Sequence, residues 1–73
     1  MNDESRSSVR YFYGEIEIEE HGKPLRAMRA RIAYRMVRSQ PQFLHAEADN
    51  GVTYPAGKIN RSSLLKGLIA HLY

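Results

Sequence analysis

The stretch that decides the fold is FYGEIEI, residues 12–18, together with MRARIAYRM, residues 28–36. In both segments the even positions are apolar, apart from Gly14, and the charged residues fall on odd positions. The first segment and the residue after it carry glutamates and the second carries arginines: Glu15, Glu17, Glu19, Arg29, Arg31 and Arg35. Because successive side chains of a strand point to opposite faces, this alternation predicts two β-strands with one buried face each.

The two segments can pair as an antiparallel hairpin that turns at residues 21–23. We expect the strands to cover about 9–20 and 26–38. With Lys23 at the centre of the turn, Glu17 faces Arg29 and Glu15 faces Arg31. Directly opposed side chains stabilise a sheet by roughly 0.2–1 kcal/mol per pair, and a slip of one residue would turn every side chain to the wrong face. In this register, Tyr11 lies opposite Arg35 and Phe12 opposite Tyr34.

A helix over residues 25–38 is the alternative. Pro24 suits the first turn of a helix, and the residues after it are good helix formers. Such a helix would carry one apolar stripe: Leu25, Met28, Ile32 and Met36. The strand is preferred because five successive even positions are apolar, which matches a period of two.

The rest of the chain predicts two short strands and one helix. Pro41 predicts a break over 39–42, because proline has no backbone donor. A strand over 43–48, a turn over 49–51 and a returning strand over 52–54 follow, the last ended by Pro55. Asn60 is a good N-cap for a C-terminal helix. That helix carries an apolar stripe: Leu64, Leu65, Leu68, Ile69 and Leu72.

These elements predict an α+β fold. It is a small antiparallel β-meander of three to four strands, covered on one face by the C-terminal helix. Residues 1–8 lack apolar periodicity and are expected to be a disordered N-terminus, and residues 9–73 to form one small domain.

Charge is distributed unevenly along the chain, although the net charge is only +3. Residues 1–20 hold two arginines and six acids, whereas residues 21–73 hold nine lysines or arginines and two acids. Such asymmetry concerns partners rather than fold. The chain has no cysteine, no secretory signal and no apolar run near the roughly 20 residues that span a bilayer. We therefore expect an intracellular protein with no membrane partner.

The open end of the hairpin is the candidate partner-binding site. Tyrosine and arginine are enriched in binding hot spots, because both combine a large contact area with a polar group. The candidate residues are Arg10, Tyr11, Tyr13, Arg29, Arg31, Arg35 and Arg38. The alternative is a solvated sheet face, whose exposed ion pairs contribute only about 0–1 kcal/mol.

Nucleic-acid binding is a second candidate function, since a β-ribbon can enter the major groove and a helix start can bind phosphate. Its candidate residues are Arg29, Arg31, Arg35, Arg38, Lys58, Arg61 and Ser62. Glu15 and Glu17 argue against it, because they stand among these arginines and repel phosphate. Ordinary capping is the better explanation of the helix start.

The sequence predicts no catalytic residue, no metal site and no cofactor. His21, His45 and His71 lie on three different elements, without the spacing of a metal motif. The pair Ser62 and Ser63 has no glycine elbow or partner histidine. We therefore expect a protein that is not an enzyme and has no small-molecule substrate.

In length, absence of cysteine and basic make-up, the chain resembles the small host-takeover proteins of bacteriophages. It is similar in size and character to the short Xanthomonas-phage regulators that bind host RNA polymerase, and the hairpin with Arg29–Arg38 is compatible with that class. The resemblance implies a non-catalytic regulator in the host cytoplasm. It implies binding to RNA polymerase, inhibition of transcription initiation and antitermination. We expect a monomer, with a dimer joined at sheet edges as the alternative.

Overall fold

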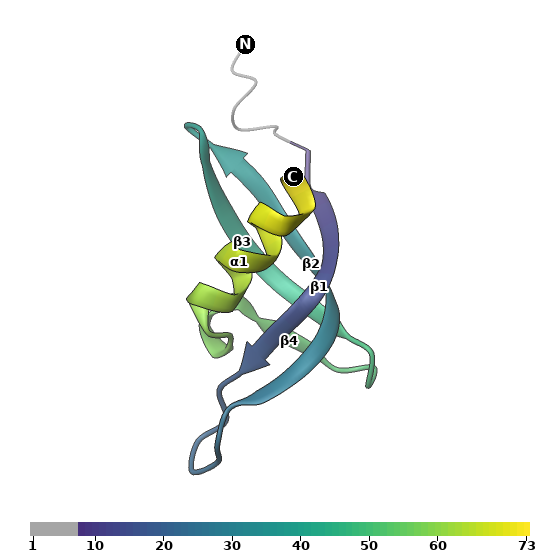
Figure 1. The fold of residues 1–73 in the computed structure, drawn as a ribbon, viewed down its shortest axis with the longest axis vertical. Helices are drawn as coiled ribbons and strands as arrows, with labels where there is room; N and C mark the ends of the chain where they lie inside the picture. The colour runs from purple at the N-terminus through teal and green to yellow at the C-terminus, as the bar shows by residue number, and fades with distance from the viewer. Residues whose placement is uncertain (1–7) are drawn as a thin grey trace.

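Four antiparallel strands and a C-terminal helix make up the fold in the computed structural model, which describes residues 8–73. The elements are β1 (Arg10–Ile18), β2 (Arg26–Val37), β3 (Gln40–Ala48), β4 (Thr53–Pro55), the short 3-10 helix η2 (Ala56–Lys58) and α1 (Arg61–Leu72) (Figure 1). The strands follow one another in sheet order β1-β2-β3-β4. The predicted α+β meander is confirmed, with a strand rather than a helix over Arg26–Val37. The disorder expected for 1–8 falls, apart from Ser8, outside the described residues.

The core lies on the even face of the first hairpin, as the period of two predicts. Strand β3 adds residues of its inner face, and Ile59 and the helix close the core. Its buried members are Phe12, Ile16, Ile18, Ala30, Ile32, Tyr34, Phe43, Ala46, Ala48, Ile59, Leu64 and Leu68. Of the predicted helical stripe only Leu64 and Leu68 are buried, while Ile69 and Leu72 are more than half exposed.

The register of the first hairpin differs from the predicted one by two residues. Glu15 lies opposite Arg29, Tyr13 opposite Arg31, and Glu17 opposite Ala27. The predicted opposition of Glu17 to Arg29 and Glu15 to Arg31 is therefore wrong. A shift of two keeps every side chain on its face, so the buried pattern is unchanged.

Gly22, rather than Lys23, stands at the centre of the hairpin. It adopts φ 77°, a left-handed conformation that glycine accepts without steric cost. Surface charge pairs are worth too little to override such a turn. The turn and the apolar packing therefore fix the register, and the charged side chains adapt to it.

The connection between β2 and β3 is a two-residue turn, where the sequence predicted a longer break. Arg38 and Ser39 both have positive φ, at 53° and 67°, which is the geometry of a tight hairpin turn. Strand β3 begins immediately at Gln40, and Pro41 lies within it opposite Met36. Pro41 is tolerated because β4 covers only residues 45–47 of β3, so its nitrogen faces an open edge.

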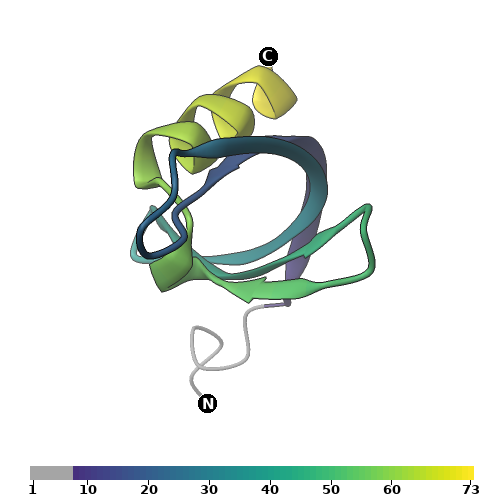
Figure 2. The ribbon, with the colours of Figure 1, turned by 90° about the horizontal axis from the view of Figure 1, so that it is seen from below.

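The sheet curves until its two ends approach each other. Figure 2 shows β2 bending round the core, with α1 lying across the molecule. Ile59 forms an isolated bridge with Ile18 of β1. The backbone N–H of Glu19 donates to the carbonyl of Lys58 at 2.8 Å, and the N–H of Asn60 to the carbonyl of Glu17 at 2.9 Å. These bonds close the edge of β1 that β2 leaves open.

Helix α1 begins at this closure and packs on β1. The side chain of Asn60 caps it by accepting from the N–H of Ser62 at 2.9 Å, as predicted. The hydroxyl of Ser63 accepts from the N–H of Glu17 at 3.1 Å and so ties the first turn to the strand. Further along, a Cβ on Gly67 would stand 3.0 Å from the Phe12 ring. A glycine here allows the close approach of helix and strand.

Candidate protein-binding face

The odd-numbered side of the hairpin, continued by β3, forms the surface that we call the outer face. Its members are Tyr11, Tyr13, Glu15, Arg29, Arg31, His45, Glu47 and Asp49. Register places Tyr13, Arg31 and Glu47 in one row across β1, β2 and β3. Tyr11 and Tyr13 are 47 % and 52 % exposed. The fully buried Ala33 lies opposite both Tyr11 and His45 in the neighbouring row.

Each tyrosine of the outer face carries an arginine on its ring. The guanidinium of Arg31 lies 4.6 Å from the ring centroid of Tyr11, and that of Arg29 lies 5.1 Å from the ring centroid of Tyr13. A cation over an aromatic face is worth about 0.5–1 kcal/mol at exposed sites. In both pairs the arginine is the diagonal rather than the direct cross-strand neighbour. The two-residue shift of register therefore creates this stacking.

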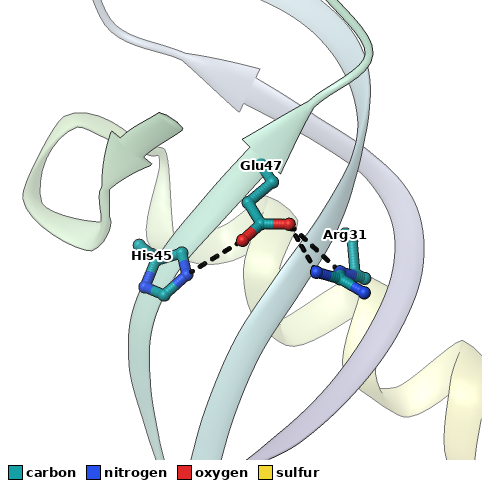
Figure 3. Close-up of polar contacts among 3 residues, drawn as sticks. All are labelled: Arg31, His45 and Glu47. Carbon is teal, nitrogen blue, oxygen red and sulfur yellow. Dashed lines mark hydrogen bonds and ion pairs between the residues drawn. The ribbon is translucent and has the colours of Figure 1, made fainter. Parts of the chain in front are cut away.

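A carboxylate holds Arg31 from the other side. Figure 3 shows Glu47 between Arg31 and His45, all three on the outer face. Nη2 and Nε of Arg31 donate to Oε1 of Glu47 at 2.6 and 3.2 Å. His45 Nε2 lies 3.7 Å from the other oxygen. Tyr11 and Glu47 thus contact Arg31 from two sides, and these contacts restrict the rotamers of the three side chains.

Tyr13 is tied to the β3–β4 turn through its hydroxyl, which donates a hydrogen bond to Asp49. The turn itself matches the sequence prediction, with Gly51 at φ 87°. The hydrogen bond to Asp49 raises the pKa of the Tyr13 phenol above 10.0, and the nearby Arg29 acts weakly in the opposite direction. Tyr13 is therefore neutral, and a donor, throughout the physiological range.

The predicted partner-binding residues do not all gather in one place. Tyr11, Tyr13, Arg29 and Arg31 meet on the outer face. The prediction that Arg35 lies opposite Tyr11 is wrong. Arg35 lies opposite Gln42 instead, and the Nε of Arg35 donates to the Oε1 of Gln42 at 2.8 Å. Arg10 stands at the first position of β1, and Arg38 on the β2–β3 turn.

The nucleic-acid candidates are more dispersed. Arg29 and Arg31 belong to the outer face beside Glu47 and Asp49. Lys58 is the last residue of η2, and Arg61 and Ser62 begin α1, where the Ser62 N–H is already bonded to the Asn60 cap. The guanidinium of Arg61 lies 5.7 Å from the ring centroid of Phe43. These positions do not form one continuous basic stripe.

Sequence reasoning missed the contributions of β3 and its turn. His45, Glu47 and Asp49 complete the outer face, and Gln42 orients Arg35. A signal was present, because Ala46 and Ala48 mark the buried face and so place Glu47 on the outer face. Of the two acids expected on that face, Glu15 does lie there, opposite Arg29. Glu17 instead accepts a hydrogen bond from Asn60 Nδ2 at 3.1 Å.

A groove of about 450 Å³ lies between β1 and α1. Glu15 and Glu17 line it from the strand, and Lys66 and His71 from the helix. Over residues 8–73, no group of three or more metal-binding side chains is assembled. No helix in that range is long and apolar enough to cross a bilayer.

Comparison with protein-family models, with curated proteins and with solved structures finds no match to this chain.

Proposed function

We propose that this protein is a non-catalytic regulator that docks on a partner protein through its outer face. The observation that carries the proposal is the pair of half-exposed tyrosines, Tyr11 and Tyr13, each stacked on an arginine. Because about half of each ring is exposed, both tyrosines remain available for contact with a partner. Tyrosine is a frequent hot-spot residue, and its neighbours on this face are arginines.

Preorganisation strengthens this proposal. Immobilising a flexible side chain on binding costs about 0.5–1.5 kcal/mol. Arg31 is already held by Tyr11 and Glu47, and Tyr13 by Arg29 and Asp49. The conformational entropy of these side chains was therefore largely lost when the protein folded, and binding of a partner costs little more. So small a protein can therefore bind tightly without a pocket.

The partner we propose is host RNA polymerase, bound to inhibit initiation and prevent termination. The support for this choice is the resemblance in size and charge to small phage regulators. In this proposal the protein acts in the cytoplasm of the host cell.

Direct nucleic-acid binding is the second candidate. The outer face does not favour it, because Glu47 and Asp49 stand among its arginines and would repel phosphate. Arg31 is moreover bonded to Glu47. Of the candidates for this role, Arg38 and Arg61 lie away from these acids.

The test measures binding of the full chain to purified, nuclease-treated Xanthomonas RNA polymerase by biolayer interferometry. We expect Tyr11→Ala and Tyr13→Ala each to weaken binding about thirtyfold, which corresponds to the loss of about 2 kcal/mol typical of a hot-spot side chain. Tyr73→Ala is the matched control, because Tyr73 is 99 % exposed and lies off the outer face. Circular dichroism checks that each variant is folded.

Run-off transcription on the same polymerase tests the regulatory effect. We expect the wild-type protein to reduce promoter-dependent initiation and Tyr11→Ala to reduce it less. Absence of binding to the polymerase would remove this partner. Equal affinity of Tyr11→Ala, Tyr13→Ala and Tyr73→Ala would remove the outer face as the docking site.

A further inference from the structure

The open edge of β3 carries a second surface, separate from the outer face. Strand β4 pairs only with residues 45–47, so within residues 8–73 no strand pairs with the first half of β3 on that side. A depression of about 520 Å³ lies there. We call it the edge groove, and its lining residues are Val37, Arg38, Gln40, Pro41, Gln42, Phe43 and Arg61.

The edge groove is basic and contains no acid. Arg38 approaches it from the β2–β3 turn and Arg61 from the start of α1. Over residues 8–73, neither arginine forms an ion pair, whereas Arg26 and Arg31 each have a carboxylate partner. Two cations without counter-charges therefore line one small groove. Its charge is uncompensated within the described part of the chain.

The backbone at Arg38 supports a role beyond folding. Its φ of 53° is a left-handed conformation that costs a side-chain-bearing residue roughly 1–2 kcal/mol. Glycine or asparagine would fill a tight hairpin turn at lower cost. The chain instead places a long cation at the tip. Backbone strain of this kind is commonly kept where a side chain has a function.

We propose that the edge groove binds an extended acidic peptide segment of a partner protein. Carboxylates of the segment would pair with Arg38 and Arg61, and an apolar side chain would pack beside Val37 and Pro41. Gln42 accepts from Arg35 through its oxygen, which leaves its amide nitrogen to donate to the peptide. Side chains rather than strand pairing carry this contact, because Pro41 removes a backbone donor from the edge.

Size and composition favour a peptide over nucleic acid. Nucleic-acid affinity accumulates over many phosphate contacts, and a groove lined by two arginines offers few. Single strands also need exposed aromatic rings on which bases stack. Phe43 is only 8 % exposed and is covered by Arg61, so it offers no such platform.

The experiment uses the ¹⁵N-labelled full chain and a synthetic peptide, DEFDEL, titrated to millimolar concentration at low salt. We expect chemical-shift changes at Arg38, Gln42, Phe43 and Arg61. The neutral peptide NQFNQL, of nearly the same shape, should cause none. No shift with DEFDEL, or equal shifts with both peptides, would overturn the proposal.

Two variants separate binding from folding. Arg38→Gly removes the charge and relieves the strained turn, so we expect peptide affinity to fall at least fivefold without a drop in Tm. Arg61→Ala should lose affinity similarly. Arg26→Ala, at the opposite end of the first hairpin, is the matched control and should bind normally. Wild-type affinity in both Arg38→Gly and Arg61→Ala would refute the site.

Two further arms distinguish this proposal from others. A (dT)₁₂ oligonucleotide is titrated under the same conditions, and binding tighter than that of DEFDEL at the same residues would assign the groove to nucleic acid. Tyr11→Ala should bind DEFDEL as the wild type does. This surface therefore stands or falls independently of docking through the outer face.

Discussion

Gly67 shows how one residue sets the distance between a helix and a strand. Sequence analysis can only count a mid-helix glycine as a cost of about 1 kcal/mol relative to alanine. In the structure its missing side chain makes room for Phe12, whose ring packs edge-on against Tyr34 at 5.6 Å between centroids. Phe12 is 3 % exposed and has little freedom to move aside.

We expect Gly67→Ala to lower the free energy of unfolding by about 1 kcal/mol. Overpacking against Phe12 costs about 1–3 kcal/mol and outweighs the gain in helix propensity. Urea unfolding measures the change. Gly57→Ala is the control, because nothing lies within 4 Å of an added Cβ there. A more stable Gly67→Ala would show that the Phe12 ring yields easily.

The hydrogen bond between Tyr13 and Asp49 on the outer face depends on pH in the alkaline range. Its pKa is raised in the folded protein, chiefly by the hydrogen bond to Asp49. The bond is therefore fully present below pH 10, and its contribution is lost as pH rises through the raised pKa. Titration of the Tyr13 Cζ resonance by ¹³C NMR should show a lower pKa in Asp49→Asn. An unchanged pKa in that variant would assign the shift to another cause.

At the scale of elements, the alternating pattern predicts the two long strands and their faces correctly, but not their register. Both registers place Ile16 and Phe12 inside, and they differ only in which surface charges meet. Since exposed pairs contribute little, they carry little information on register. The left-handed Gly22 carries more, because it marks the centre of the turn.

The residues of the candidate site could be predicted from the sequence in part, but their contacts could not. Faces set by period two place Tyr11, Tyr13, Arg29 and Arg31 together, so that part was predictable. Their stacking and the bonds to Glu47 and Asp49 depend on the register and on where β3 lies. Neither the register nor the position of β3 is encoded locally. The bulge between Ala33 and Tyr34, for example, shifts the pairing of β3 with β2 by one residue.

Asn60 joins helix α1 to strand β1 with both ends of its side-chain amide. Oδ1 caps the helix, while Nδ2 donates to Glu17 Oε1 at 3.1 Å. Aspartate is as good an N-cap as asparagine, yet it would set a carboxylate against Glu17. We expect Asn60→Asp to lower the free energy of unfolding by about 1 kcal/mol at pH 7, measured by urea unfolding.

Adding Glu17→Gln to Asn60→Asp tests the cause of that loss. The double variant removes the repulsion and keeps the cap, so stability should return towards the wild type. If the double variant is no more stable than Asn60→Asp, repulsion with Glu17 is not the reason.

For the molecule as a whole, the protection of its sheet edges bears on association. Ile59 covers the edge of β1 that does not pair with β2. At the opposite edge of the sheet, the short β4 covers residues 45–47 of β3, and Pro41 lies in the part of β3 that β4 does not cover. Prolines and bulges on edges discourage pairing between chains. We expect a monomer in solution, with a light-scattering mass of 8.4 kDa. Twice that mass at micromolar concentration would instead support the alternative of a dimer.

The closure between Ile18 and Ile59 has a consequence for biosynthesis. While the ribosome makes the chain, β1 to β4 can emerge and pair before residues 58–60 are free. Until then the polar backbone atoms of Glu17 and Glu19 have no protein partner. The nascent meander is therefore an open ribbon that other strands or chaperones can bind. The core is complete only when residues 58–60 and helix α1 have left the exit tunnel.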